Sequence, residues 1–134
     1  MAKVKKRYAK PGYWRCETYF INVWFFVGWP KDKVLHYLSK NCGLAPAQAP
    51  DLCGSGKLFK LTSSNGALTH CIWTDSTPLK GDGANSLAHE AVHVATDVMN
   101  ARGIPISYEN DEILCYLTGR IVREAHMTLQ KARK

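Results

Sequence analysis

SLAHEAVHVATDVMNA, residues 86–101, is the most regular amphipathic segment of the chain, and the expected fold is built around it. At 100° per residue, its apolar side chains fall on one side of a helix and its polar side chains on the other. Ser86 suits an N-cap, and Gly103 and Pro105 follow where such a helix would end. The segment therefore predicts a helix with one face on a core and one polar face.

The polar face of this helix holds HEAVH, residues 89–93. His89 and His93 are one turn apart, so both imidazoles can bind one zinc ion. Glu90 then lies beside the metal without binding it, where it can accept a proton from the water that zinc activates. The spacing predicts a Zn²⁺ site with His89 and His93 as ligands and Glu90 as the catalytic base.

A catalytic zinc site needs a third protein ligand, and two acids downstream can supply it. Glu112 follows His93 after 18 intervening residues, and Glu109 follows after 15. Asn110 is a suitable cap for a second helix that begins at Asp111. The buried stripe of that helix comprises Ile113, Leu117, Ile121, Ala125 and Leu129. Glu112 lies off this stripe and is the favoured ligand, with Glu109 as the alternative, although acids are also expected at any helix N-terminus.

The remaining polar candidates have less specific patterns. Asp97 lies one turn beyond His93 on the polar face of the first helix. It can accept the second ring N–H of a ligating histidine, or it can be a solvated residue, and the sequence leaves both open. His36, His70 and His126 have no partner at metal-ligand spacing, so they are expected to be ordinary residues.

Strands are predicted in the first half of the chain. Residues 13–29 are dense in aromatic and β-branched side chains and favour one long or two short buried strands. A helix is expected over 33–40. Residues 57–62 and 67–74 flank an Asn-Gly turn, which predicts a hairpin. The expected fold class is α+β, with a small, mostly antiparallel sheet packed against the HEAVH helix and a second long C-terminal helix.

Length, composition and charge favour one globular domain. The chain has 134 residues, of which 46% are hydrophobic and 22% charged, as expected for a single domain over 1–134. Its net charge is +7, but residues 1–10 carry +5 and residues 131–134 carry +3, which leaves −1 for the body. These two short basic arms predict only weak, nonspecific contact with nucleic acid, because no basic face is indicated.

Cysteine usage and hydropathy bear on the compartment. Five cysteines at scattered spacings do not predict a disulfide framework. The longest apolar run, residues 19–29, is too short to span a bilayer as a helix. Charged residues at 31–33 separate it from any sequence resembling a cleavage site, which disfavours a signal peptide. We therefore expect no membrane anchor and a cytoplasmic location, while the sequence indicates no oligomeric state.

HEAVH followed by 18 residues and Glu112 resembles the gluzincin branch of zinc metallopeptidases, which combine HExxH with a glutamate from a following helix. More closely, HCIWTD, LAHEAVHVATDVMNARGIPI and NDEILCYLTG resemble small zincin-like proteins encoded by bacteriophages and prophages, across residues 67–122. The resemblance implies a zincin-like metallopeptidase acting on a peptide or protein, in the host cytoplasm or the virion. It also implies that an edge strand before the helix lines the cleft, which places residues 67–74 against an extended peptide.

The residue that would stabilise the oxyanion is left open by the sequence. Each candidate can equally be a packing or surface residue. The candidates are Tyr108, Tyr116, Arg120 and His126.

Two other functions are also compatible with the motif. A non-catalytic zinc-binding phage structural or assembly protein would keep the metal, but Glu90 favours an enzyme, because a purely structural site has no use for a base. A nucleic-acid-associated protease of the SprT-like kind would take its third ligand from a later histidine. Here the only later histidine is His126, which follows His93 after 32 intervening residues. A zinc metallopeptidase is the preferred interpretation.

Overall fold

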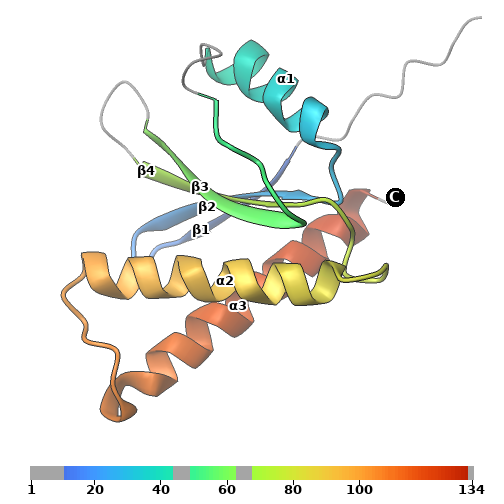
Figure 1. Cartoon of the computed structure of the whole chain (residues 1–134). Coiled ribbons are helices and arrows are strands. Elements are labelled where there is room, and N and C mark those ends of the chain that lie inside the picture. Colours follow the sequence, from blue (N-terminus) through green and yellow to red (C-terminus); the bar gives the residue numbers. More distant parts are fainter. Residues whose placement is uncertain (1–10, 44–48, 63–67, 133–134) are drawn as a thin grey trace, which may run out of the picture.

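A computed structural model of the chain describes residues 11–43, 49–62 and 68–132. The described chain has four strands and three helices, with one short 3-10 turn before the last helix (Figure 1). The elements are β1 (Gly12–Cys16), β2 (Ile21–Val27), α1 (Lys31–Cys42), β3 (Gly56–Thr62), β4 (Leu68–Thr74), α2 (Gly83–Ala101), η2 (Tyr108–Asn110) and α3 (Asp111–Ala132).

The strands form one sheet in the order β1-β2-β4-β3. The β1–β2 and β3–β4 pairs are antiparallel, whereas β2 and β4 run parallel, so the sheet is mixed. The predicted α+β class is confirmed, and so are a sheet, the HEAVH helix and a long C-terminal helix. The parallel pair was not predicted, because β2 and β4 are far apart in the sequence and their pairing has no local signal.

The position of β4 corrects one expectation. Residues 67–74 were expected to be an edge strand, but β4 lies between β2 and β3, and residue 67 is outside the described residues. Five consecutive residues of β4, 70–74, are buried, which suits a strand covered on both faces. β3 carries two exposed lysines, Lys57 and Lys60, and only one fully buried residue, as is typical of an edge strand. The edge beside the HEAVH helix is therefore β3.

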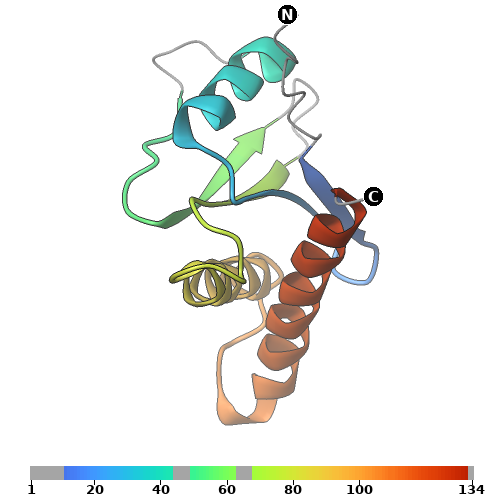
Figure 2. The same ribbon diagram turned by 90° about the vertical axis from the view of Figure 1, so that its right-hand side faces the viewer.

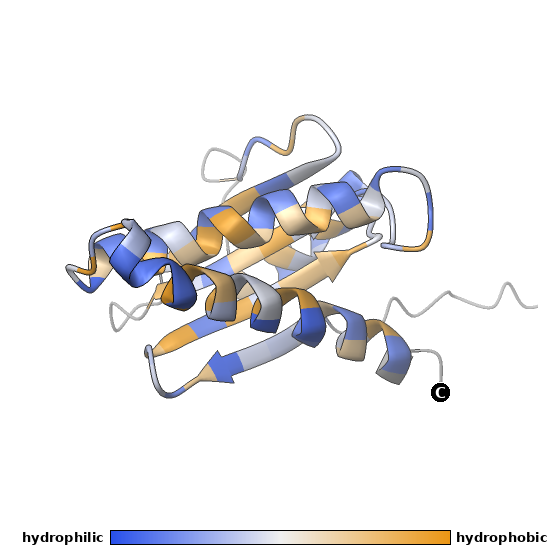
Figure 3. Cartoon of the chain, turned by 90° about the horizontal axis from the view of Figure 1, so that it is seen from below, coloured by the Kyte–Doolittle hydropathy of each residue, from blue (hydrophilic) through white to orange (hydrophobic). Residues whose placement is uncertain are grey.

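The helices cover both faces of the sheet. Figures 1 and 2 show α1 on one face and α2 with α3 on the other. Buried side chains of β2, β4, α2 and α3 form the larger core, and those of β2, β3, β4 and α1 form the smaller one. Figure 3 views the sheet from the side of α2 and α3, where hydrophobic and hydrophilic residues alternate along both helices. Each helix thus buries one face, as its sequence pattern requires.

The predicted helices are present with small shifts. The segment 13–29 contains two strands, and α1 extends the predicted 33–40 helix at both ends. Helix α2 begins at Gly83 rather than Ser86, whose amide instead donates to the Asp82 carbonyl oxygen inside the first turn. The predicted Asn-Gly turn at 65–66 lies outside the described residues. Among the described helices, none is long and apolar enough to cross a membrane.

Candidate metal centre

Three side chains of HEAVH meet strand β3 at a shared cavity. His89, Glu90 and His93 line a cavity of about 370 Å³ on the side of α2 that faces the sheet edge. The opposite wall comes from β3 and the segment just before it. Its residues are Cys53, Gly56, Lys57 and Leu58.

The two histidines converge on one point. Their Nε2 atoms are 3.0 Å apart and their ring centroids 4.7 Å apart. Two nitrogen ligands of a tetrahedral zinc ion, each 2.0–2.1 Å from the metal, lie about 3.4 Å apart. A small outward rotation of either ring would therefore admit a metal. The helical i, i+4 spacing alone produces this geometry, as the sequence predicts.

Glu90 is buried without a partner. Its exposed fraction is only 7%, and within the described part of the chain it has no hydrogen bond or ion pair. The Glu90 carboxylate oxygens are not among the fully enclosed polar atoms that lack a partner, so they reach the cavity while the rest of the side chain is covered. Glu90 also lines the cavity together with both histidines. Its environment therefore fits a group that a ligand or a metal-activated water completes.

Close packing of β3 on α2 shapes this cavity. A Cβ atom at Gly56 would lie 3.2 Å from the Trp73 carbonyl oxygen, 3.3 Å from Ser86 Cβ and 3.5 Å from Glu90 Cγ. Just before Gly56, the Ser55 and Ser86 hydroxyl oxygens are 2.9 Å apart in a hydrogen bond. The beginning of β3 is thus held against the turn of α2 that carries Glu90, and a larger residue at position 56 would push the two apart.

The acids predicted as third ligand lie elsewhere. Within the described residues, no group of three or more His, Cys, Asp or Glu side chains is placed to hold a metal ion, so neither Glu112 nor Glu109 joins the histidine pair. Glu112 occupies the exposed first turn of α3, and Glu109 the exposed turn η2 before it.

The course of α3 explains this separation. One turn after Glu112, the Tyr116 ring packs 6.5 Å from that of Tyr19 in the β1–β2 turn. The same Tyr19 accepts a hydrogen bond from Arg102, just after α2 ends. His93 precedes Arg102 by nine residues, about 14 Å of helix. The start of α3 therefore lies by the far end of α2 and the β1 side of the sheet, whereas the histidines face the β3 edge.

The oxyanion candidates also lie outside the cavity. Tyr108 is almost fully exposed, and Tyr116 packs on Tyr19. Arg120 pairs with Glu124 at 3.1 Å, and His126 is half-buried on α3. The lining instead contains Lys57 and Cys53, which sequence analysis did not single out. Neither residue belongs to a sequence motif, because each comes close to α2 only through the long-range packing of β3 and the segment before it.

A second histidine cluster lies further along α2. His70 Nε2 is 2.7 Å from Asp97 Oδ2, and Lys60 Nζ is 3.3 Å from the same carboxylate. Asp97 therefore pairs with His70 of β4, a residue that was expected to be ordinary, and its side chain is partly exposed. The structure pairs Asp97 with His70 and not with His93. The hydrogen bond from His70, supported by Lys60, lowers the Asp97 pKa below its usual value.

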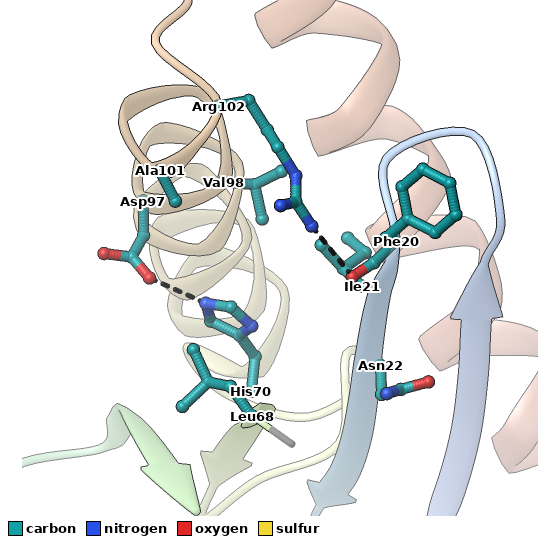
Figure 4. Close-up of a pocket in the computed structure, with 9 residues that line it drawn as sticks. All are labelled: Phe20, Ile21, Asn22, Leu68, His70, Asp97, Val98, Ala101 and Arg102. Atoms are coloured by element: carbon teal, nitrogen blue, oxygen red, sulfur yellow. Dashed lines mark hydrogen bonds and ion pairs between the residues drawn. The ribbon is translucent and has the colours of Figure 1, made fainter. Parts of the chain in front are cut away.

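This second cluster borders a cavity of about 320 Å³ between α2 and β2 (Figure 4). His70 is buried, and its Nδ1 atom has no hydrogen-bond partner within the described residues. Because a carboxylate only accepts, Nε2 carries the proton and donates to Asp97. In Figure 4 the Arg102 side chain points across the cavity to the β1–β2 turn. Through Asp97 the cluster ties β3 and β4 to α2, while His70 Nδ1 is left without a partner among the described residues.

Comparison of the chain with protein-family models, curated proteins and solved structures finds no match. The histidine pair, the buried Glu90 and the edge strand beside them are therefore the features from which a function can be argued.

Proposed function

We propose that this chain is a zinc-dependent metallopeptidase with a zincin-like fold, in which α2 supplies two metal ligands and the catalytic base. The observation that carries the proposal is the pair of Nε2 atoms 3.0 Å apart beside a buried, partnerless Glu90 in one cavity. Imidazole nitrogens are favoured zinc ligands, and their spacing is close to that of two ligands of one ion. The histidine pair can therefore supply two of the three protein ligands that a catalytic zinc ion needs.

Each residue of the motif has a separate task. Bound zinc would polarise a substrate carbonyl and lower the pKa of water, which is the chemistry that the side chains alone do not supply. His89 and His93 would hold the metal through Nε2. Glu90 would accept the proton of the attacking water and deliver it to the departing amine, from its place in the lining of the same cavity.

Strand β3 is the proposed binding strand for the substrate. Its partner in the sheet is β4 on one side, and its other side is an edge. Lys57 and Leu58 of this strand line the same cavity as the histidines. An extended peptide can add to such an edge by main-chain hydrogen bonds, which would present its carbonyl groups to the metal centre. This role replaces the one expected for residues 67–74.

The first experiment measures metal and hydrolysis separately. Wild type, the double variant His89→Ala/His93→Ala, and Glu90→Gln are dialysed against metal-free buffer, reloaded with zinc and examined by elemental analysis. We expect one zinc per chain in wild type and in Glu90→Gln, and none in the double variant. Hydrolysis of a quenched fluorescent peptide library should fall about 10²–10⁴-fold in Glu90→Gln, the usual contribution of a general base.

Glu109→Gln is the matched control, because it removes an exposed carboxylate that lies outside the cavity. It should keep both zinc and activity. Absence of zinc from the wild type would contradict the proposal. Zinc bound through the histidines without any wild-type hydrolysis would favour the alternative of a non-catalytic zinc-binding phage structural or assembly protein.

A further inference from the structure

We propose that Cys53 is the third protein ligand of the metal centre, so that zinc is held by two imidazoles and one thiolate. This inference rests on the proposed function, because it concerns the ligand set of the same site. The sequence pattern favours Glu112 for this place, but the structure puts Glu112 at the far end of α2.

The cavity itself points to Cys53. Among the residues that line it, the only groups that commonly bind zinc are the two histidines, Glu90 and Cys53. The Cys53 thiol is free and exposed. Glu90 is the independent sign of a ligand, because it is more than nine-tenths buried, lines this cavity and has no partner among the described residues.

The chain around Cys53 is anchored on both sides. Leu52 is buried in the core beneath α1. Ser55 is fixed twice, since its hydroxyl pairs with Ser86 at 2.9 Å and its carbonyl oxygen accepts the Asp75 amide at 3.0 Å. Ser86 lies one turn before the HEAVH segment. The short segment that carries Cys53 is therefore fixed on both sides by residues that do not themselves bind metal, at the border of the cavity that the histidines line.

Cys53 has to move for its thiol to join the histidine pair. In the structure as described, no three potential ligands are placed to hold a metal together, so Cys53 must turn inward on binding. Gly54, which follows it, has φ +72° and would place a Cβ in open space. This left-handed glycine gives the backbone freedom between the two anchors. A Zn–S bond of about 2.3 Å is also longer than a Zn–O bond, which reduces the movement required.

The resulting ligand set retains a catalytic site. Three protein ligands leave one position of tetrahedral zinc open, and Glu90 remains unligated beside it. A thiol must lose its proton to bind zinc, so metal binding through Cys53 releases a proton that binding through a carboxylate would not. The thiolate also provides a spectroscopic signature that no His/His/Glu site has.

The test uses cobalt in place of zinc. The full chain and its variants are kept reduced, stripped of metal and titrated with Co²⁺, and the near-ultraviolet sulfur-to-cobalt charge-transfer band is recorded. We expect the band in wild type, in Glu112→Gln and in Cys115→Ser, which removes another exposed cysteine. In Cys53→Ser the band should disappear and cobalt affinity should fall about 100-fold or more, beyond the 10–100-fold typical of residues that only support a ligand.

Two further results would overturn the inference in different ways. Cobalt bound through His89 and His93 without a sulfur band, and with affinity lost in Glu112→Gln, would assign Glu112 and leave the proposed function intact. Failure of wild type to bind cobalt or zinc would remove the metal centre and the proposed function together. Because Cys53 is exposed, Cys53→Ser should keep the far-ultraviolet circular dichroism of wild type, which excludes unfolding as the cause.

Discussion

Helix α2 carries two clusters of histidine and acid that differ in how their polar groups are used. In the cluster of His70, Asp97 and Lys60, the Asp97 carboxylate accepts hydrogen bonds from His70 and from Lys60. In the cluster of His89, Glu90 and His93, the buried carboxylate has no partner in the described chain. We call the first cluster closed, because its carboxylate is satisfied by neighbouring side chains even though His70 Nδ1 has no partner among the described residues, and we call the second cluster open. A carboxylate that is satisfied internally indicates a structural role, and one without a partner indicates a site for something else.

The two clusters also differ in what they connect. Asp97 joins α2 to β4 through His70 and to β3 through Lys60, so the closed cluster holds the second half of the helix to the sheet. The open cluster lies where β3 begins and where a cavity separates the helix from the strand. Substitutions in the closed cluster should therefore reduce stability, and those in the open cluster should reduce function and leave stability intact or improved.

Disruption of the closed cluster is expected to have the largest effect on stability. Asp97→Ala removes the hydrogen-bond partner of His70 Nε2 and leaves both ring nitrogens of a buried imidazole unpaired. The free energy of unfolding of the Asp97→Ala variant should be about 1–3 kcal/mol lower than that of wild type, which is the cost of an unsatisfied buried polar group. Urea denaturation of the metal-free protein measures this.

Lys60→Ala is the control for charge alone, because the Lys60–Asp97 ion pair is largely exposed and should contribute at most about 1 kcal/mol. If Asp97→Ala were no more destabilising than Lys60→Ala, the hydrogen bond to His70 would not be structural.

The open cluster should respond in the opposite direction. Glu90→Gln replaces a buried, unpaired charge by a neutral side chain of the same shape. Because burying a charge costs more than burying an amide, the metal-free variant should be about 1 kcal/mol more stable than wild type. Thermal and chemical denaturation in the presence of a chelator would show it. A clear loss of stability would mean that Glu90 has a structural partner after all.

Local features of the sequence predicted the open cluster correctly. The i, i+4 spacing of His89 and His93 brings their rings together in any α-helix, whatever the rest of the chain does. The amphipathic pattern likewise fixed which face of α2 is buried. The same pattern put Glu90 on the polar face, and its burial was not predicted because it comes from the packing of β3 on α2.

Features that depend on distant parts of the chain were not predictable in the same way. The parallel pairing of β2 with β4 put β3 at the edge, although the hairpin pattern alone did not distinguish the two strands. The distance of Glu112 from the histidines depends on how α3 crosses α2, which no spacing of 18 residues determines. Cys53 adjoins the cavity only because Gly56 allows β3 to approach α2. Each of these is a consequence of tertiary packing.

Acid should weaken the closed cluster within a defined pH range. In the folded protein the hydrogen bond from His70, and the nearby Lys60, hold the Asp97 pKa below its ordinary value. Over the range between the two pKa values, the unfolded chain binds more protons at this position than the folded chain. The stability that the carboxylate contributes is therefore complete above the ordinary pKa of about 3.9 and is lost as the pH falls through the lower folded value.

Comparison with Asp97→Asn isolates this titration, since the amide oxygen can still accept from His70 but does not ionise. The difference in free energy of unfolding between wild type and Asp97→Asn, measured by urea denaturation, should shrink as the pH falls below about 4. The difference is smaller than that of Asp97→Ala because the hydrogen bond survives. A difference that stayed constant down to pH 3 would show that Asp97 acts only as a neutral acceptor, and that the closed cluster owes its stability to the hydrogen bond and not to charge.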